Sequence, residues 1–168
     1  MTPDGKYLIS GAGIANKDEI APICVWDTSN WTLKKKLNFH YKGIQTIKIS
    51  NCGKYMISVG NKEERSVCVW NFSNLTVLDS KSLKFPIIDI SPEKTSNEAN
   101  LYFCSISFDV LSFWRMGPDQ RLEGIHSRID DLTIEREDGE VFVSIEMTPY
   151  FENLRNSFVL VGTNTGKN

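Results

Sequence analysis

The sequence predicts an all-β fold built from one unit of four antiparallel strands that is repeated along the chain. A tryptophan closes a short run rich in β-branched and aromatic residues at Trp26, Trp70 and Trp114, and each interval between them is 44 residues. Similar runs elsewhere are bounded by Gly, Pro, Asn and Asp, which is typical of strands and turns. Because no segment shows an apolar period of 3.6 residues over a helical length, helices are not expected.

Each period contains four strand-like runs. In the second period they cover residues 44–50, 55–60, 66–70 and 76–83. Four antiparallel strands in a period of about 40–45 residues form one blade of a β-propeller. The first period lacks a first strand and the last stops after its second strand. We therefore expect a partial propeller of about three and a quarter blades.

A Ser or Thr that ends an apolar run and opens a turn recurs in phase with the tryptophans, at Thr2, Ser50, Ser91 and Thr148. The last interval between these markers is 57 residues and the one before it is 41, which predicts an acidic insertion over 128–139. The expected units are an incomplete first blade over 1–38, a second over 39–83, a third over 84–127, and the start of a fourth over 140–168.

A second register fits the region of the insertion. It places His126, Ile129, Leu132 and Ile134 at the start of the fourth blade and makes Val141–Met147 its second strand. The match between Thr148-Pro149 and Ser91-Pro92 favours the first register.

The turn segments PDGKYLIS and CGKYMIS, together with the endings VWD and VWN, resemble the turn and the name-giving dipeptide of the WD-repeat family. The resemblance extends over essentially the whole chain. It implies a propeller of WD repeats whose blades contain an internal polar network. In that network a His before the first strand, a Ser or Thr in the second and a Trp in the third are hydrogen-bonded, usually with an Asp between the second and third strands.

The second unit matches this network best, with His40, Ser58 and Trp70. Its Asp place falls in NKEER, where Glu63 or Glu64 is the available substitute. A buried indole N–H and a buried hydroxyl need hydrogen-bond partners. The resemblance therefore implies a structural rather than a catalytic role for His40 and Ser58.

The other two units match in part. Ser105, Asp109 and Trp114 fit the network in the third unit, where the His place holds Lys84 or Phe85. In the first unit Ser10 and Trp26 fit. These residues are also expected to be structural.

The sequence predicts no catalytic residue, no cofactor and no metal site. Cys24 and Cys68 each lie two residues before a tryptophan, a recurrence that is typical of small buried apolar residues. The sequence contains no CxxC pair of the kind that binds zinc. GTNTGKN is one residue too short for a phosphate loop and lacks its hydroxyl residue. Lys34–Lys36 are expected at a blade's outer edge, where lysines discourage strand pairing. The remaining candidates lack EF-hand spacing and are expected in a solvated acidic loop: Asp130, Asp131, Glu135, Glu137, Asp138 and Glu140.

The chain is therefore expected to be a scaffold that binds other proteins. A net charge of −2 without a basic excess argues against nucleic acid, and no apolar run reaches the roughly 20 residues of a membrane span. A cytoplasmic location is expected because MTPDGKYLIS lacks the order of a signal peptide. The turns between second and third strands resemble those of WD-repeat proteins of microtubules, cilia and flagella. A substrate-receptor module, as in ubiquitin ligation, is the alternative, and open strand edges predict self-association.

Overall fold

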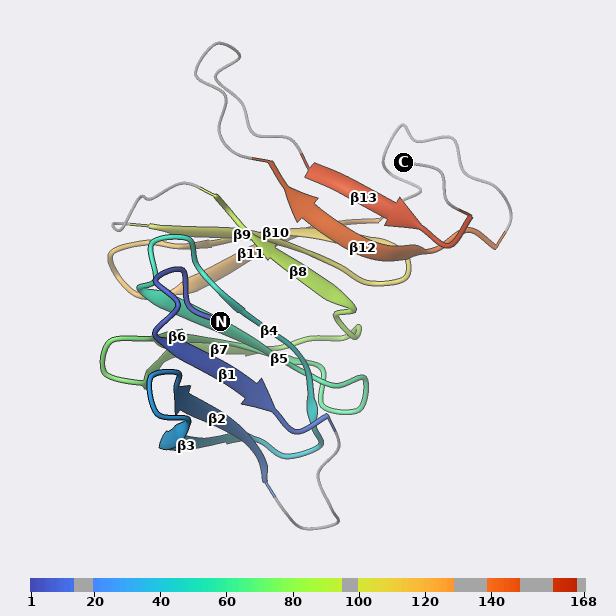
Figure 1. Ribbon diagram of the computed structural model, residues 1–168. Helices are drawn as coiled ribbons and strands as arrows, with labels where there is room; N and C mark the ends of the chain where they lie inside the picture. The colour runs from blue at the N-terminus through green and yellow to red at the C-terminus, as the bar shows by residue number, and fades with distance from the viewer. Residues whose placement is uncertain (14–19, 95–99, 129–138, 149–158, 166–168) are drawn as a thin grey trace.

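The structure is a computed structural model that describes residues 1–13, 20–94, 100–128, 139–148 and 159–165. These residues form four antiparallel sheets (Figure 1). The first sheet contains β1 (Tyr7–Gly11), β2 (Ala21–Asp27) and β3 (Thr32–His40). The second contains β4 (Ile44–Ile49), β5 (Tyr55–Gly60), β6 (Ser66–Asn71) and β7 (Thr76–Ser82). The third contains β8 (Asp89–Pro92), β9 (Leu101–Ile106), β10 (Val110–Met116) and β11 (Leu122–Arg128), and the fourth β12 (Phe142–Met147) and β13 (Val159–Thr163).

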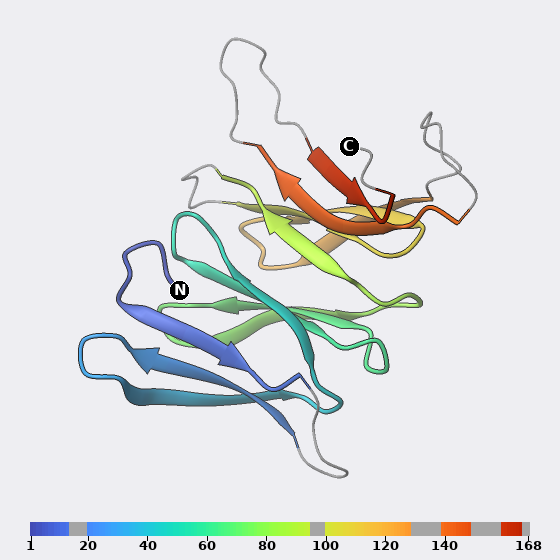
Figure 2. The same cartoon turned by 45° about the vertical axis from the view of Figure 1, so that its right-hand side comes forward.

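The four sheets are stacked in chain order (Figures 1 and 2). Within each sheet every strand pairs with its neighbour in sequence. The first strands of the second, third and fourth sheets lie close together, β4 beside β8 and β8 beside β12. This is the arrangement of blades in a β-propeller, so the predicted all-β partial propeller is confirmed.

A hydrophobic core fills each space between consecutive sheets. Ile23 and Val25 meet Met56 and Trp70 in the first space. In the second space Ile57 and Val69 meet Phe103 and Trp114, and in the third Ile106 and Leu111 meet Ile145 and Met147. Fully burying one such side chain typically contributes about 1.5–3 kcal/mol, so each sheet is stabilised by its neighbours.

The strand register repeats from sheet to sheet around the three tryptophans. Trp26 lies opposite Leu8, Trp70 opposite Met56, and Trp114 opposite Phe103, each on the third strand against the second. The period of 44 residues in the sequence therefore corresponds to one repeated structural position.

The turn marker is displaced in the third sheet. The amides of Thr2 and Ser50 donate to the carbonyls of Tyr7 and Tyr55, and both turns contain a glycine with a φ of +73°. In the third sheet the corresponding bond to the carbonyl of Tyr102 comes from Glu93, whereas Ser91 and Pro92 lie inside β8. The prediction that Ser91 opens this turn was wrong, because β8 continues two residues further than the marker indicates.

The fourth sheet has the first of the two registers considered. β12 lies beside β8 and pairs with β13, which makes β12 a first strand. His126 lies on β11, which pairs with β10 as the last strand of the third sheet. The first sheet extends to His40, where β3 ends, whereas the predicted first unit ended at residue 38. Most of the predicted insertion, residues 129–138, lies outside the described residues.

Candidate functional site

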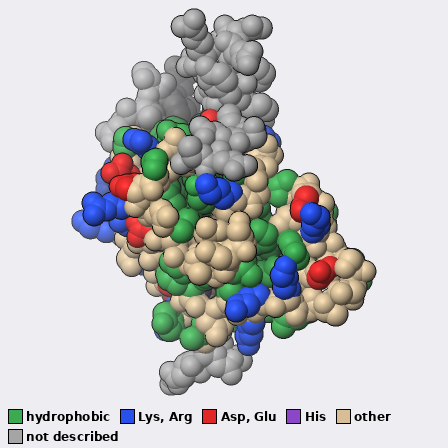
Figure 3. All heavy atoms as spheres, turned by 90° about the vertical axis from the view of Figure 1, so that its left-hand side faces the viewer, with side chains coloured by type: hydrophobic (Ala, Val, Ile, Leu, Met, Phe, Trp, Pro, Cys, Tyr) green, Lys and Arg blue, Asp and Glu red, His purple; other side chains and the backbone are tan. Residues whose placement is uncertain are grey.

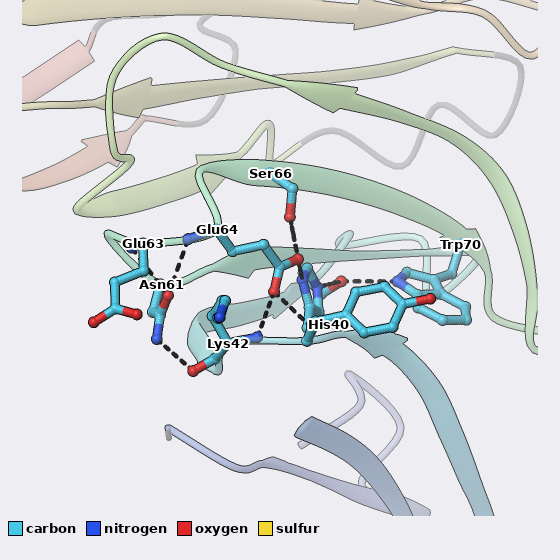
Figure 4. Close-up of polar contacts among 9 residues, drawn as sticks. His40, Lys42, Asn61, Glu63, Glu64, Ser66 and Trp70 are labelled. Carbon is cyan, nitrogen blue, oxygen red and sulfur yellow. Dashed lines mark hydrogen bonds and ion pairs between the residues drawn. The ribbon is translucent and has the colours of Figure 1, made fainter. Parts of the chain in front are cut away.

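A chain of hydrogen bonds runs from Trp70 in the second sheet to Glu64 in the turn between β5 and β6 (Figure 4). The Nε1–H of Trp70 donates to the Ser58 hydroxyl oxygen at 2.9 Å. That oxygen lies 2.8 Å from Nε2 of His40, whose Nδ1 lies 2.6 Å from Oε1 of Glu64. The side chains of His40 and Ser58 are completely buried and Trp70 is 3% exposed. These bonds join three strands, β3, β5 and β6, to the turn between β5 and β6.

The proton positions of this chain follow from its donors and acceptors. Because the Ser58 oxygen accepts from Trp70, its own proton is available for Nε2 of His40. The other nitrogen of a neutral imidazole then carries the hydrogen and donates to the Glu64 carboxylate. Every donor therefore has an acceptor when His40 is neutral and Glu64 is ionised.

The electrostatics agree with this assignment. Burial lowers the pKa of His40 more than the hydrogen bond and charge of Glu64 raise it. Burial raises the pKa of Glu64, but hydrogen bonds from Ser66, the Lys42 amide and His40 outweigh it and hold that pKa below its ordinary value. A neutral imidazole thus lies beside a carboxylate.

Both oxygens of Glu64 are fully used. Oε1 accepts from His40 and from the Ser66 hydroxyl, and Oε2 accepts the backbone amides of Tyr41 and Lys42 at 2.7 and 3.0 Å. The sequence left Glu63 and Glu64 open for this place. Glu64 occupies it, and Glu63 is exposed.

The sequence analysis missed Asn61 and Ser66, which support Glu64. The Oδ1 of Asn61 accepts the amides of Glu63 and Glu64, and its Nδ2 donates to the carbonyl of Lys42 at 2.6 Å. An Asn at the start of a turn commonly bonds the backbone two or three residues later, so its position after β5 was the available signal. Asn61 and Glu64 together fasten the loop at 41–43 to the turn at 61–65.

The first and third sheets contain only part of the network. Trp26 donates to Ser10 at 2.9 Å, and Trp114 donates to Ser105 at 2.8 Å. In the third sheet no described imidazole bonds Ser105. His126 instead bonds Ser112 at 2.8 Å and packs edge-on against Phe85 and Trp114.

Asp109 does not take the place that the resemblance implied. It is exposed at the tip of a short turn, which is closed by a bond from the Ser107 amide to the Val110 carbonyl. In the second sheet the acidic side chain bonds the imidazole of His40. In the third sheet that place holds Lys84 or Phe85, so Asp109 has no corresponding imidazole to bond. Asp109 instead borders a hollow of about 620 Å³ together with Phe85, His126 and Arg128.

The remaining candidates have ordinary structural surroundings. Burial raises the pKa of the Cys68 thiol and raises that of Cys104 to about 12, which keeps both thiols protonated. Lys34 lies exposed on β3 and donates to the Tyr7 hydroxyl. Glu140, predicted in a solvated loop, is 4% exposed and accepts a hydrogen bond from Thr165, because it lies against the end of the β12–β13 hairpin. The other five acidic residues of that predicted loop lie outside the described residues.

Two classes of site are absent from the described parts of the chain. No three His, Cys, Asp or Glu side chains gather there as ligands for a metal ion. No helix there is long and apolar enough to cross a bilayer.

Comparison with known proteins finds several relatives. No family model matches the chain. WD repeat-containing protein 90 of Xenopus tropicalis is 24% identical over 171 residues, covering 99% of this chain and 8% of the relative. The protein of the same name in Mus musculus is 21% identical over 114 residues, covering 68% of this chain and 6% of the relative. The pre-rRNA-processing protein IPI3 of Candida albicans is 33% identical over 76 residues, covering 45% of this chain and 14% of the relative. The chain thus spans a small part of the length of each relative.

A solved structure supports the fold. The crystal structure of the Myceliophteria thermophila Cps50 (Swd1) β-propeller domain matches with a TM-score of 0.70 at 17% identity, covering 99% of this chain and 48% of that one. The repeated Trp–Ser hydrogen bond and the named relatives agree with this likeness. The chain is thus similar in sequence to WD repeat-containing proteins and has the fold of a β-propeller.

Proposed function

We propose that this chain is a non-catalytic scaffold that binds another protein at the end of the second sheet where the Tyr41 loop lies. The observation that carries the proposal is the attachment of this loop to the buried network. Glu64 holds the amides of Tyr41 and Lys42, and Asn61 holds the Lys42 carbonyl. A loop fixed before binding loses little conformational entropy when a partner docks.

The side chains that this platform presents suit a protein partner. Tyr41 is 66% exposed, and its neighbours Lys42, Lys62, Glu63 and Arg65 are exposed as well. An aromatic anchor surrounded by charged groups of both signs is a common composition at protein interfaces. Figure 3 shows the opposite side of the molecule, the left-hand side of Figure 1, where basic, acidic and hydrophobic side chains are also exposed.

Photo-crosslinking tests this platform with a matched control on the same strand. Trp31 immediately precedes β3 and Tyr41 immediately follows it, so they lie at opposite ends of the strand, roughly 30 Å apart. They are 67% and 66% exposed. A photoreactive phenylalanine analogue at position 41 of the full-length protein is expected to give protein adducts in cells, and one at position 31 much less adduct. Equal yields, or none at position 41, would overturn the proposal.

We further propose that the protein acts in the cytoplasm, at the cytoskeleton or cilium. The support is the resemblance of the turns over 11–26 and 59–70 to those of WD-repeat proteins of these structures. Co-sedimentation of the full-length protein with purified microtubules, together with its localisation as a fluorescent fusion, tests this setting. A diffuse nuclear signal with no microtubule binding would contradict it.

A further inference from the structure

The hollow beside Asp109 lies between the second and third sheets, where the linker that follows β7 passes the starts and ends of β10 and β11. Its volume is about 620 Å³. Both neighbouring sheets contain four strands, so each wall belongs to a complete blade. We call this hollow the linker pocket, and it is lined by charged, aromatic and apolar side chains: Lys84, Phe85, Asp109, Val110, His126 and Arg128.

The repeat explains why a hollow remains at this place. Lys84 and Val110 lie one period of 44 residues after His40 and Ser66. In the second unit the Ser66 hydroxyl oxygen lies 3.3 Å from Nδ1 of the fully buried His40. Lys84 is exposed instead, and Val110 has no polar group to offer. The third unit therefore lacks the polar contact that occupies the equivalent place in the second.

Described contacts hold the walls of the linker pocket in place. The Arg65 guanidinium donates to the carbonyl of Lys84 at 3.2 Å, which fastens the linker to the turn between β5 and β6. The ring of His126 packs edge-on against Phe85, and its Nδ1 lies 2.8 Å from the Ser112 hydroxyl oxygen. A ligand therefore enters a site that is already formed, and little of the chain has to be ordered on binding.

The charges around the linker pocket are not balanced. In the parts of the chain that the structure describes, Lys84, Arg128 and Asp109 form no ion pair. Burial lowers the pKa of His126, so its ring is uncharged near neutral pH. The lining therefore combines two cations and one carboxylate with aromatic and apolar side chains. A ligand that joins an anionic group to an apolar one complements this lining.

We propose that the linker pocket binds an acidic peptide segment of a partner protein, with an Asp or Glu carboxylate of that segment paired with Arg128 and Lys84. A guanidinium can bond both oxygens of a carboxylate. Phe85 and Val110 provide apolar contact for a neighbouring side chain of the peptide. Asp109 can accept a backbone N–H of the segment, and it repels a phosphate, with about two negative charges, more than a carboxylate.

Selection from random heptapeptides displayed on phage tests the proposal on the purified chain. Peptides with an Asp or Glu beside an apolar residue are expected to be enriched, and the Arg128→Glu chain is expected to enrich none of them. Arg121→Glu is the matched control, because Arg121 is also exposed but precedes β11, whereas Arg128 ends it. This control is expected to enrich the same peptides as the unmodified chain, and circular dichroism verifies that both variants are folded.

Fluorescence anisotropy with one enriched peptide identifies the recognised group. Replacing the acidic residue of the peptide by its amide is expected to weaken binding by at least about tenfold, because a charge-assisted pair is lost. Lys84→Glu in the chain is expected to weaken binding as well. A selection without acidic peptides, equal binding by the Arg128→Glu and Arg121→Glu chains, or tighter binding of a phosphoserine form of the peptide would each overturn the proposal. The linker pocket is separate from the Tyr41 loop, so this result and the crosslinking result are independent.

Discussion

The imidazole Nδ1 of His40 lies 2.6 Å from Oε1 of Glu64, and this contact joins the end of the first sheet to the turn between the second and third strands of the second. His40 is the last residue of β3, yet its ring is bonded to Ser58 on β5. One buried side chain therefore couples two successive sheets. The carboxylate of Glu64, at the place where the resemblance implies an Asp, bonds both the imidazole and the loop amides of Tyr41 and Lys42.

Glu64→Gln is expected to lower the free energy of unfolding by about 1–3 kcal/mol, because the introduced NH2 group meets donors on whichever side it faces. Chemical denaturation measures the loss. Glu63→Gln is the control, since Glu63 is exposed in the same turn and its replacement is expected to change stability by less than about 0.5 kcal/mol. Equal effects of the two substitutions would show that the carboxylate of Glu64 is not part of a buried network.

His40→Ala is expected to destabilise by about 1–3 kcal/mol, because Ser58 loses its acceptor and Glu64 loses a donor. Combining it with Glu64→Gln should cost less than the sum of the two single effects, since residues in one network are coupled. Thermal melts of the four proteins give the coupling. An unchanged melting temperature in His40→Ala would contradict the network.

Stability is expected to fall as the pH decreases from about 7 toward 4. The pKa of His40 is lower in the folded chain than its unfolded value of about 6.5, so protonation below that pH favours unfolding. The pKa of Glu64 is also lowered, so its contribution is present above its unfolded pKa and is lost as the pH falls through the folded pKa. Urea midpoints across this range should change less in the His40→Ala, Glu64→Gln double variant. An identical pH dependence of the two proteins would refute the assignment.

Iodoacetamide is expected to modify Cys24 and Cys52 in the folded chain and to spare Cys68 and Cys104 until denaturant is added. The first two thiols are half-buried, whereas the other two are buried, and burial raises their pKa and suppresses the reactive thiolate. Mass spectrometry of peptides gives the labelling at each site. Rapid labelling of Cys68 in the native chain would show that β6 is not held between two sheets.

The positions of the strands could be predicted from the sequence because one physical requirement recurs in it. Each unit needs a large apolar residue at the same place on its third strand. Trp26, Trp70 and Trp114 occupy that place, so their regular spacing is visible in the sequence. The partners of His40 were harder to predict. Glu63 and Glu64 are chemically alike, and only the fold of the turn around Asn61 decides which carboxylate points inward.

Asp109 and Ser91 are positions where the sequence prediction failed. Each has the expected residue type but lies in a different structural environment from its counterpart in the second sheet. Asp109 has the expected chemistry, but the third sheet holds Lys84 or Phe85 where the second sheet has His40, so the carboxylate has no imidazole to bond. Ser91 resembles the turn residues Thr2 and Ser50, but its hydroxyl accepts the Met147 amide of the fourth sheet instead. Contacts between sheets of this kind are absent from the local sequence pattern.

The most direct test of the repeat is the free energy of unfolding of Trp70→Ala compared with that of Trp31→Ala. Trp70 is 3% exposed between two sheets, and Trp31 is 67% exposed in a turn outside the period of 44 residues. Loss of the buried side chain is expected to cost about 3–5 kcal/mol, and loss of the exposed one less than about 0.5 kcal/mol. Comparable losses in the two variants would contradict the strand register on which the propeller assignment depends.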